Sequence, residues 1–366
     1  MPLTEPLQQI GRTFVLHRGR KLVYFGGCDY FRMGSHPDVL QALQEGLEEF
    51  GLNVAASRST TGNHKLFGQL ERALARFLRT DRAALVSSGY AANFAFAQSV
   101  AGKFTHALID TQAHSSLRDA SELLGARVVW FRHQDSGDLR KHLLRLGRGA
   151  RPLIMTDGMF AHDGSLAPLD EYLQALPRTG LLQVDDAHGA GILGKKGGGT
   201  PEVFRLNDPR IVQTFSLSKA FGVYGGAVAG NAGVVEAVQN NSRIFSGNTP
   251  LPLPLVNAAL KSAELLRTDD SFRQRLRTNT AQIKTACRAG GIVLAENDSP
   301  VLSFVPATAL IAANIFRRLL RAGIYPPLIR YGNEVPHGRF RFAISSEHTP
   351  AQLDTLAKTV ISALQP

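Results

Sequence analysis

Two short runs are the most informative about the fold of this chain. They are Val184-Asp185-Asp186-Ala187-His188-Gly189 and, further along, Ser216-Leu217-Ser218-Lys219-Ala220-Phe221-Gly222. Asp185 is expected to close a buried strand, where a carboxylate is costly unless it has a partner such as a pyridinium nitrogen. Lys219 stands between small hydroxyl residues and a glycine-containing turn, which suits a Schiff base to an aldehyde beside a bound phosphate. Taken singly, the first run also fits a metal site or an ion-paired loop, and the second fits an ordinary loop. Together they are the parts that a pyridoxal phosphate (PLP) site needs.

Short apolar runs alternate with amphipathic stretches around these two runs. Strands are predicted over 83–87, 107–110, 127–131, 153–156, 181–185 and 211–215, and helices from Ala91, over 115–124 and around 139–146. Strands separated by helices in this way form crossover units in a mainly parallel sheet, so the fold class is α/β. Ligands of such sheets bind at the carboxyl ends of the strands, where this chain carries mostly polar residues.

The C-terminal part follows a different pattern. Residues 248–254 (NTPLPLP) are too rich in proline for a continuous helix and are expected to form a hinge. Beyond them, helices are predicted over 255–266 and 271–289, strands over 301–305 and 339–344, and a last helix from Pro350. The expected domains are an N-terminal arm (1–35), a large PLP-binding domain (36–247) and a small α+β domain (248–366).

Composition excludes several classes of protein. The 366 residues are 44% hydrophobic, which rules out wholesale disorder, and carry a net charge of +11. No apolar stretch is long enough to span a bilayer, and the N-terminal run is not that of a secretory signal. Two cysteines, Cys28 and Cys287, exclude a disulfide scaffold and a four-cysteine zinc site; they are expected to be packing residues in a cytoplasmic protein. No nucleic-acid-binding motif accompanies the positive charge, so an anionic small molecule is the expected partner, and no metal is expected.

Six blocks together resemble the α-oxoamine synthases, the fold-type I PLP enzymes that condense an amino acid with an acyl-CoA and release CO2. They are residues 87–93 (SSGYAAN), 110–117 (DTQAHSSL), 156–164 (TDGMFAHDG) and 339–349 (RFRFAISSEHT), with the two runs quoted above. The resemblance implies a large domain with a mainly parallel seven-stranded sheet and a smaller C-terminal α+β domain. It also implies an acyltransferase that acts on a small amino acid and an acyl-CoA as a homodimer. The GYAAN and VDDAHGAG runs are most similar to the 8-amino-7-oxononanoate synthase branch, which serves biotin biosynthesis.

The resemblance assigns four catalytic residues by matching position. Lys219 would form the Schiff base and then act as base and acid at the substrate α-carbon. Asp185 would pair with the protonated ring nitrogen. His188 would lie near the 3-hydroxyl of the ring, and His114 would stack on the ring face.

The same comparison assigns the residues that hold the cofactor phosphate. Gly89 and Tyr90 would begin a helix whose backbone N–H groups meet the phosphate, helped by the helix dipole. Ser216 and Ser218 would add hydroxyl contacts. In the family the partner subunit supplies one more contact, and Ser246 matches it.

Arg341 matches the arginine that grips the carboxylate of the amino acid, a pairing that a planar guanidinium serves well. From the residues alone, Arg341 equally fits an ordinary surface strand. No residue distinguishes alanine, glycine and serine as the amino acid.

Two positions depart from the family pattern. Ala161 and His162 replace a Ser-Met pair, so a hydroxyl near the 3-oxygen of the ring is missing. Phe67 replaces a histidine, and His64, one turn earlier, is a candidate substitute. Arg58 matches an arginine that several branches share.

Two alternatives to the synthase remain open on the sequence. The departures at Ala161 and Phe67 favour an aminotransferase or another PLP enzyme of the same fold that does not use CoA. A binding protein that has lost catalysis is a third possibility, against which the presence of Lys219 argues.

Overall fold

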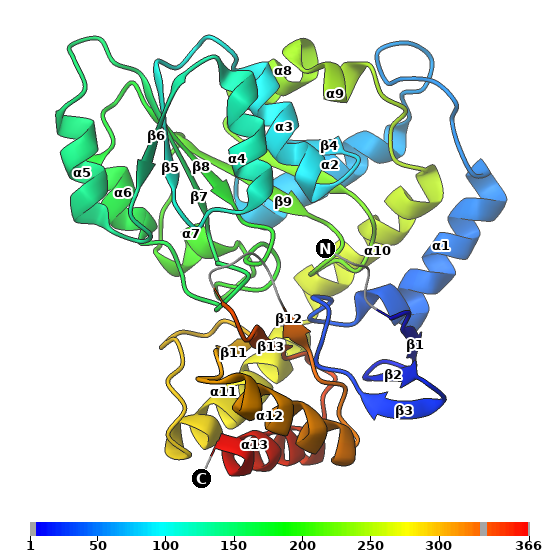
Figure 1. The fold of residues 1–366 in the computed structure, drawn as a ribbon. Coiled ribbons are helices and arrows are strands. Elements are labelled where there is room, and N and C mark those ends of the chain that lie inside the picture. The colour runs from blue at the N-terminus through cyan, green and yellow to red at the C-terminus, as the bar shows by residue number, and fades with distance from the viewer. Residues whose placement is uncertain (1–4, 330–334, 365–366) are drawn as a thin grey trace. The chain divides into compact units, whose positions relative to one another are not determined.

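The computed structural model describes residues 5–329 and 335–364. They form two compact units (Figure 1). The first takes the described parts of Met1–Ser35, Ala161–Ser165 and Ser271–Pro366, and the second takes His36–Phe160 and Leu166–Asp270. The short segment Ala161–Ser165 thus belongs with the C-terminal part of the chain. The domain limits 1–35, 36–247 and 248–366 stay a prediction.

The second unit is built on a seven-stranded sheet in the order β4-β10-β9-β8-β7-β5-β6. Its strands are β4 (Arg82–Val86), β5 (His106–Asp110), β6 (Arg127–Phe131), β7 (Pro152–Asp157), β8 (Leu181–Asp185), β9 (Ile211–Ser216) and β10 (Gly226–Gly230). Neighbours from β9 to β6 are parallel, whereas β10 runs antiparallel to β9 and to β4. The predicted α/β class with a mainly parallel sheet is therefore confirmed.

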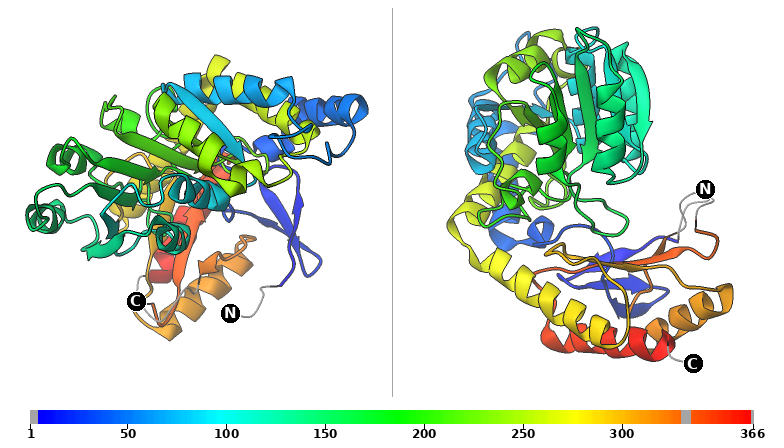
Figure 2. Two further views of the ribbon diagram at one scale, coloured as in Figure 1. Left: turned by 90° about the horizontal axis from the view of Figure 1, so that it is seen from above. Right: turned by 90° about the vertical axis from the view of Figure 1, so that its left-hand side faces the viewer.

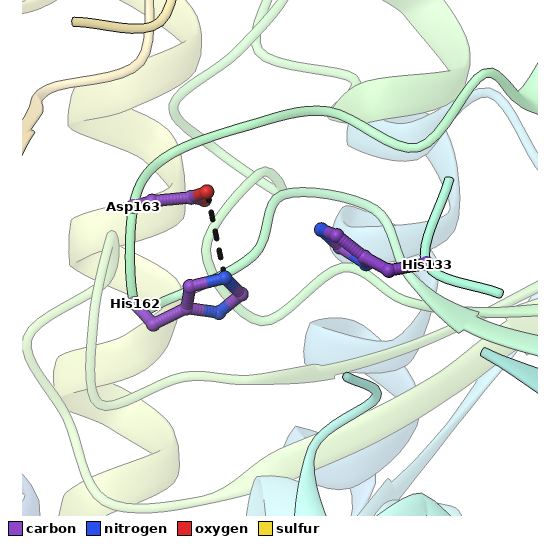
Figure 3. A group of neighbouring side chains, drawn as sticks. All are labelled: His133, His162 and Asp163. Atoms are coloured by element: carbon purple, nitrogen blue, oxygen red, sulfur yellow. Dashed lines mark ion pairs between the residues drawn. The ribbon is translucent and has the colours of Figure 1, made fainter. Parts of the chain in front are cut away.

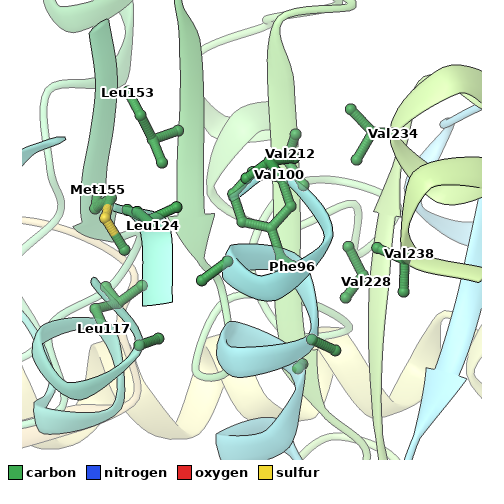
Figure 4. Packing of buried hydrophobic residues seen from close by; sticks show 14 of the residues in the cluster. Phe96, Val100, Leu117, Leu124, Leu153, Met155, Val212, Val228, Val234 and Val238 are labelled. Atoms are coloured by element: carbon green, nitrogen blue, oxygen red, sulfur yellow. The ribbon is translucent and has the colours of Figure 1, made fainter. Parts of the chain in front are cut away.

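Helices cover both faces of this sheet because successive side chains of a strand point to opposite faces. On one face, α3 (Gly89–Ser99), α4 (Ser115–Ser121) and α8 (Ala232–Asn241) share a core with Ile109 and Met155 (Figure 4). On the other face, α5 (Ser136–Leu144) and α6 (Leu169–Ala175) share a core with Leu108 and Ile154. Burial on both sides makes the parallel strands continuously apolar until their polar carboxyl ends.

A further group of helices completes the second unit. Helix α10 (Leu253–Thr268) packs against α1 (Pro37–Phe50) and α2 (Lys65–Leu78). A Cβ at Gly46 would lie 2.9 Å from Pro254 Cα, so glycine allows the close approach of α1 and α10. Residues 248–252 contain no helix, and Pro254 lies in the first turn of α10, where proline is tolerated. The short helices are η2 (Glu122–Leu124), α7 (Thr200–Val203) and α9 (Arg243–Ser246).

The first unit contains an antiparallel sheet in the order β11-β13-β12, formed by Val301–Phe304, Arg339–Ala343 and Leu328–Ile329. Helices α11 (Ser271–Ala289), α12 (Ala309–Arg321) and α13 (Pro350–Leu364) pack on it (Figure 2). The N-terminal strands β1 (Gln8–Ile10), β2 (Phe14–His17) and β3 (Arg20–Val23) form a small antiparallel sheet, followed by η1 (Met33–Ser35). Val23 N donates to Gly323 O (2.8 Å), which ties this sheet to the C-terminal part.

Within residues 5–329 and 335–364, no helix combines the length and the apolar character of a membrane span.

Candidate active site

Two aspartates meet at the carboxyl edge of the large sheet. Strands β7 and β8 end at the same level, with Asp157 paired in register with Asp185. Both are buried, at 5% and 6% exposure. Burial, and then the negative charge of Asp185, raise the pKa of Asp157 well above its usual range, while Lys219 acts in the opposite direction. The edge therefore brings two buried carboxyl groups together, with the positive charge of Lys219 acting on Asp157.

The Asp185 carboxylate is held from the protein side. Asn93 Nδ2 donates to Oδ2 over 2.6 Å, and Ala187 N donates to Oδ1 over 3.1 Å. These two donors fix the direction of the carboxylate. A carboxylate that binds the ring of a cofactor has to be oriented in this way.

Asn93 is a fully buried junction. Besides its bond to Asp185, its Nδ2 donates to Ser116 Oγ (2.8 Å). Its Oδ1 accepts from Gln183 Nε2 (3.0 Å) and from Thr214 Oγ1 (2.6 Å). Asn93 thus ties helix α3 to three elements around the edge, a role that the sequence motifs did not reveal.

His114 joins the same network through Ser116. It is the N-cap of α4, and its Nδ1 accepts from Ser116 N (3.2 Å) and lies 2.7 Å from Ser116 Oγ. Its backbone N donates to Asp157 Oδ2 (2.7 Å). Because Nδ1 accepts from a backbone N–H, the proton of the neutral ring is assigned to Nε2. The structure therefore joins His114 to Asp185 through Ser116 and Asn93.

The start of α3 lies directly against the end of β9. A Cβ at Gly89 would be 2.7 Å from Ser216 Cβ, so only glycine fits there without displacement. Ser88 caps the helix by accepting from Ala91 N (3.1 Å), and the N–H groups of Gly89 and Tyr90 have no acceptor in the described part of the chain. Ser216 Oγ lies 2.6 Å from Ser218 Oγ. Free N–H groups beside two hydroxyls suit a phosphate dianion.

The side chain of Tyr90 points away from the start of α3 where these N–H groups lie, so Tyr90 could offer a phosphate only its backbone N–H in this phosphate cradle (Gly89, Tyr90, Ser216 and Ser218). Its side chain is 48% exposed and its hydroxyl donates to Asp119 Oδ2 (2.5 Å). Its ring stacks on Phe94.

The two neighbouring aspartates of residues 184–189 have different surroundings. Asp185 faces the carboxyl edge, whereas Asp186 accepts from Thr200 N (3.0 Å), Thr200 Oγ1 (2.7 Å) and Gln213 Nε2 (3.0 Å). Burial raises the pKa of Asp186 to about 7. A Cβ at Gly189 would lie 2.1 Å from Asp186 Oδ1, which explains the glycine that ends the run.

Two of the predicted catalytic residues follow these strands directly. Lys219 is half-buried in the turn after β9, and its charge lowers the pKa of Asp157. His188 follows β8 and is 6% exposed. Both therefore lie at the ends of the strands that carry Ser216 and Asp185.

Arg341 lies on β13 of the first unit. Its Nη1 donates to Ala161 O (3.3 Å) and its Nη2 to Cys28 Sγ (2.9 Å). Cys28 was expected only to pack, so its hydrogen bond to Arg341 is a role that the sequence did not show. Cys287 is buried, which raises the pKa of its thiol to about 12.

The segment that carries Ala161 also carries an ion pair. His162 Nε2 lies 3.4 Å from Asp163 Oδ2 (Figure 3). Burial raises the pKa of Asp163, but the pair with His162 and the hydrogen bonds from Ser165 together outweigh this and hold it below its usual range. In the second unit, the ring of His133 has its own partner, Asp110 Oδ1, at 2.9 Å.

The chain is similar to several known proteins over most of its length. The family described as aminotransferase class I and II matches residues 21–360. An 8-amino-7-oxononanoate synthase from Thioalkalivibrio sulfidiphilus is 35% identical over 93% of this chain and 88% of its own length, and 8-amino-7-oxononanoate synthase 2 from Bacillus subtilis is 33% identical over the same shares. A serine palmitoyltransferase from S. paucimobilis with bound PLP–myriocin aldimine superposes with a TM-score of 0.90 at 31% identity, covering 97% of this chain and 90% of that one.

The chain belongs to the α-oxoamine synthase family. Membership confirms the predicted fold type I and the predicted class of PLP-dependent acyltransferase. An 8-amino-7-oxononanoate synthase from Francisella tularensis has the same fold, with a TM-score of 0.80 at 26% identity over 93% of this chain and 97% of its own.

In this α-oxoamine synthase, the residues around the Phe67 departure have separate roles. Phe67 is fully buried and lies under the guanidinium of Arg58, 4.9 Å from its centre. His64 instead caps α2 by accepting from Leu66 N (3.3 Å), with its ring edge-on to Phe50. His64 is therefore part of the helix start and does not contact Arg58 as Phe67 does.

Ser246, the predicted phosphate contact from the partner, ends helix α9. Its Oγ donates to Ser242 O (3.0 Å), and its carbonyl accepts from Ser59 Oγ (2.9 Å). The contact across a subunit boundary stays a prediction.

Proposed function

We propose that this α-oxoamine synthase condenses a small amino acid with an acyl-CoA, the reaction that its similarity to the 8-amino-7-oxononanoate synthases implies. The net reaction joins the amino acid α-carbon to the acyl carbonyl carbon and releases CoA and CO2. The observation that carries the proposal is the buried carboxylate of Asp185, oriented by Asn93 next to His114 and the phosphate cradle.

The residues present fit PLP. Asp185 offers a buried, oriented carboxylate to a pyridinium nitrogen at the strand edge that it shares with Asp157. The N–H groups of Gly89 and Tyr90, with Ser216 and Ser218, offer donors to a phosphate. When bound there, PLP supplies an electron sink for negative charge at the substrate α-carbon.

Each of the protein groups would then have its own role in the reaction. Asp185 keeps a proton on the ring nitrogen, and Asn93 keeps Asp185 in place. Lys219 anchors the cofactor aldehyde and later moves the proton at the α-carbon. His114 would cover one face of the ring, and His188 would lie near its 3-hydroxyl. Arg341 binds the amino-acid carboxylate through its planar guanidinium.

The experiment is a thiol-release assay with purified protein, PLP, a panel of alanine, glycine and serine, and acyl-CoAs of varied length. Amino-acid-dependent release of CoA thiol is expected, and its loss in Lys219→Ala serves as the control. Amino-group transfer to a keto acid without any thiol release would favour the second candidate, an aminotransferase of the same fold. That candidate is supported by the departures at Ala161 and Phe67.

We further propose a homodimer in the cytoplasm. The dimer follows from the role that the family gives to the position of Ser246. The compartment follows from Cys28 and Cys287, both of which are free thiols. Sedimentation of the active enzyme as a monomer would contradict the dimer.

A further inference from the structure

A buried ion pair lies next to the phosphate cradle. Arg58 Nη1 donates to Glu71 Oε1 over 2.5 Å and Nη2 to Oε2 over 3.1 Å, a two-bond pairing of guanidinium and carboxylate. The two side chains are only 11% and 10% exposed. Burial of such a pair costs free energy of folding unless other groups complete its hydrogen bonds. The remaining partners of the pair therefore indicate its role in the structure.

The remaining partners come from three segments: strand β4, the start of α2 and helix α9. Glu71 Oε1 accepts from the backbone N of Leu85 (3.1 Å), and Arg58 Nε donates to Asn63 Oδ1 (3.1 Å). The rings of Phe67 and Phe245 lie 4.9 and 5.2 Å from the guanidinium centre. Aromatic rings at this distance attract the cation.

One of these contacts leads to the turn that would hold the cofactor phosphate of this chain, and another leads to Ser246, which would contact the phosphate of the partner subunit. Leu85 lies in β4, which runs straight into the phosphate turn, residues 87–90. Phe245 lies in α9, next to Ser246, whose carbonyl accepts from Ser59, the neighbour of Arg58. A cavity of about 20 Å³ beside Arg58, Phe67, Phe245 and Ser87 leaves room for a single water, so these groups have little space to shift.

We infer that Arg58 and Glu71 are positioning residues for the cofactor phosphate. They fix strand β4, and with it the phosphate turn, against helix α9. Phe67, where the family has histidine, supplies the ring face that holds Arg58 against Glu71. The inference rests on the proposed function, because it requires the PLP phosphate to bind at residues 87–90.

The test compares PLP with pyridoxal, which has the same ring and aldehyde but no phosphate. Dissociation constants are measured from the cofactor absorbance for Arg58→Met and Glu71→Gln. Glu71→Gln keeps an oxygen for Leu85 N–H while removing the charge. Both variants should weaken PLP about tenfold or more and change pyridoxal by less than about twofold.

Arg82→Met is the matched control. Arg82 begins the same strand, and its pair with Glu236 is exposed, at 53% and 51%. Exposed pairs contribute little, so this variant should bind both cofactors as the wild type does.

A purely structural pair would give a different result. Variants that lose stability to urea but keep the wild-type ratio of PLP to pyridoxal affinity would overturn the inference, as would an equal loss of both affinities. If a single variant fails to fold, the double variant Arg58→Met/Glu71→Met removes both charges and is measured in the same way. A wild type that binds PLP no more tightly than pyridoxal would instead refute the phosphate site of the proposed function.

Discussion

Replacing Gly89 by alanine tests the phosphate cradle with a single methyl group. The backbone of Gly89 is helical, and alanine ordinarily stabilises a helix relative to glycine by about 1 kcal/mol. Here the new Cβ would lie 2.7 Å from Ser216 Cβ, 3.1 Å from Ser216 Cα and 3.2 Å from Ser216 N. Helix α3 and strand β9 would therefore have to separate by about 1 Å to restore ordinary contact.

The magnitude follows from that displacement. Overpacking of a rigid contact costs about 1–3 kcal/mol, so the net loss of unfolding free energy should be about 0–2 kcal/mol after the helical gain. The N–H groups of Gly89 and Tyr90 move with the helix. Weakening one hydrogen bond to a charged phosphate by about 1.5 kcal/mol lowers PLP affinity about tenfold.

The assay pairs urea unfolding of the apo-protein with PLP titration by absorbance. Gly233→Ala is the control, because Gly233 also lies in the first turn of a helix but its Cβ would meet nothing closer than Asn231 Oδ1 at 3.4 Å. That variant should be at least as stable as the wild type and bind PLP equally well. A Gly89→Ala protein with unchanged stability and PLP affinity would refute the reasoning.

Three further predictions concern single residues. Asp185→Asn should slow deuterium uptake at the amino-acid α-carbon about 100-fold, because an amide does not keep the ring nitrogen protonated; a loss below about tenfold in an NMR exchange assay would contradict this. Arg341→Lys should raise KM for the amino acid about tenfold with a smaller change in kcat, since lysine lacks the planar pair of donors; steady-state kinetics with an unchanged KM would speak against that role. Burial, and then Arg288, lower the pKa of Lys284 from 10.5 to about 8, so the unfolded chain binds a proton that the folded chain has lost between these pH values. The free energy of unfolding should therefore rise from pH 8 to 10.5, by at most about 3 kcal/mol, and Lys284→Met should lack this rise in denaturation curves.

Much of the large sheet could be predicted from the sequence because its strands are apolar runs that end in polar residues. The predicted limits of β6, β8 and α11 agree with the structure. Strand β10 was missed because Gly226–Gly230 (GAVAG) is made of small residues with little strand preference. The small N-terminal sheet and helices α1, α2 and α12 were also not predicted.

The residues of the candidate site were also predicted only in part. Residues within motifs, such as Asp185 and Gly89, were found because their chemistry or their resemblance marks them. Asn93 and Ser116 lie in motifs too, but their hydrogen bonds join segments far apart in the sequence, and no local pattern encodes such pairs. The Arg58–Glu71 pair was missed for the same reason, although the sequence did mark Phe67 as unusual.

The place of β4 in the sheet has a consequence for synthesis of the chain. In the described sheet, β4 is an edge strand that pairs only with β10, so that Val86 lies opposite Gly226. On the ribosome, β4 and the phosphate turn are made long before β10, and contacts between distant segments form slowly. Until Gly226–Gly230 emerges, Ala83–Val86 is an apolar strand without a partner, and such edges pair readily with other chains. A nascent chain that stops before β10 therefore leaves an apolar strand unpaired beside the turn that would hold the cofactor phosphate.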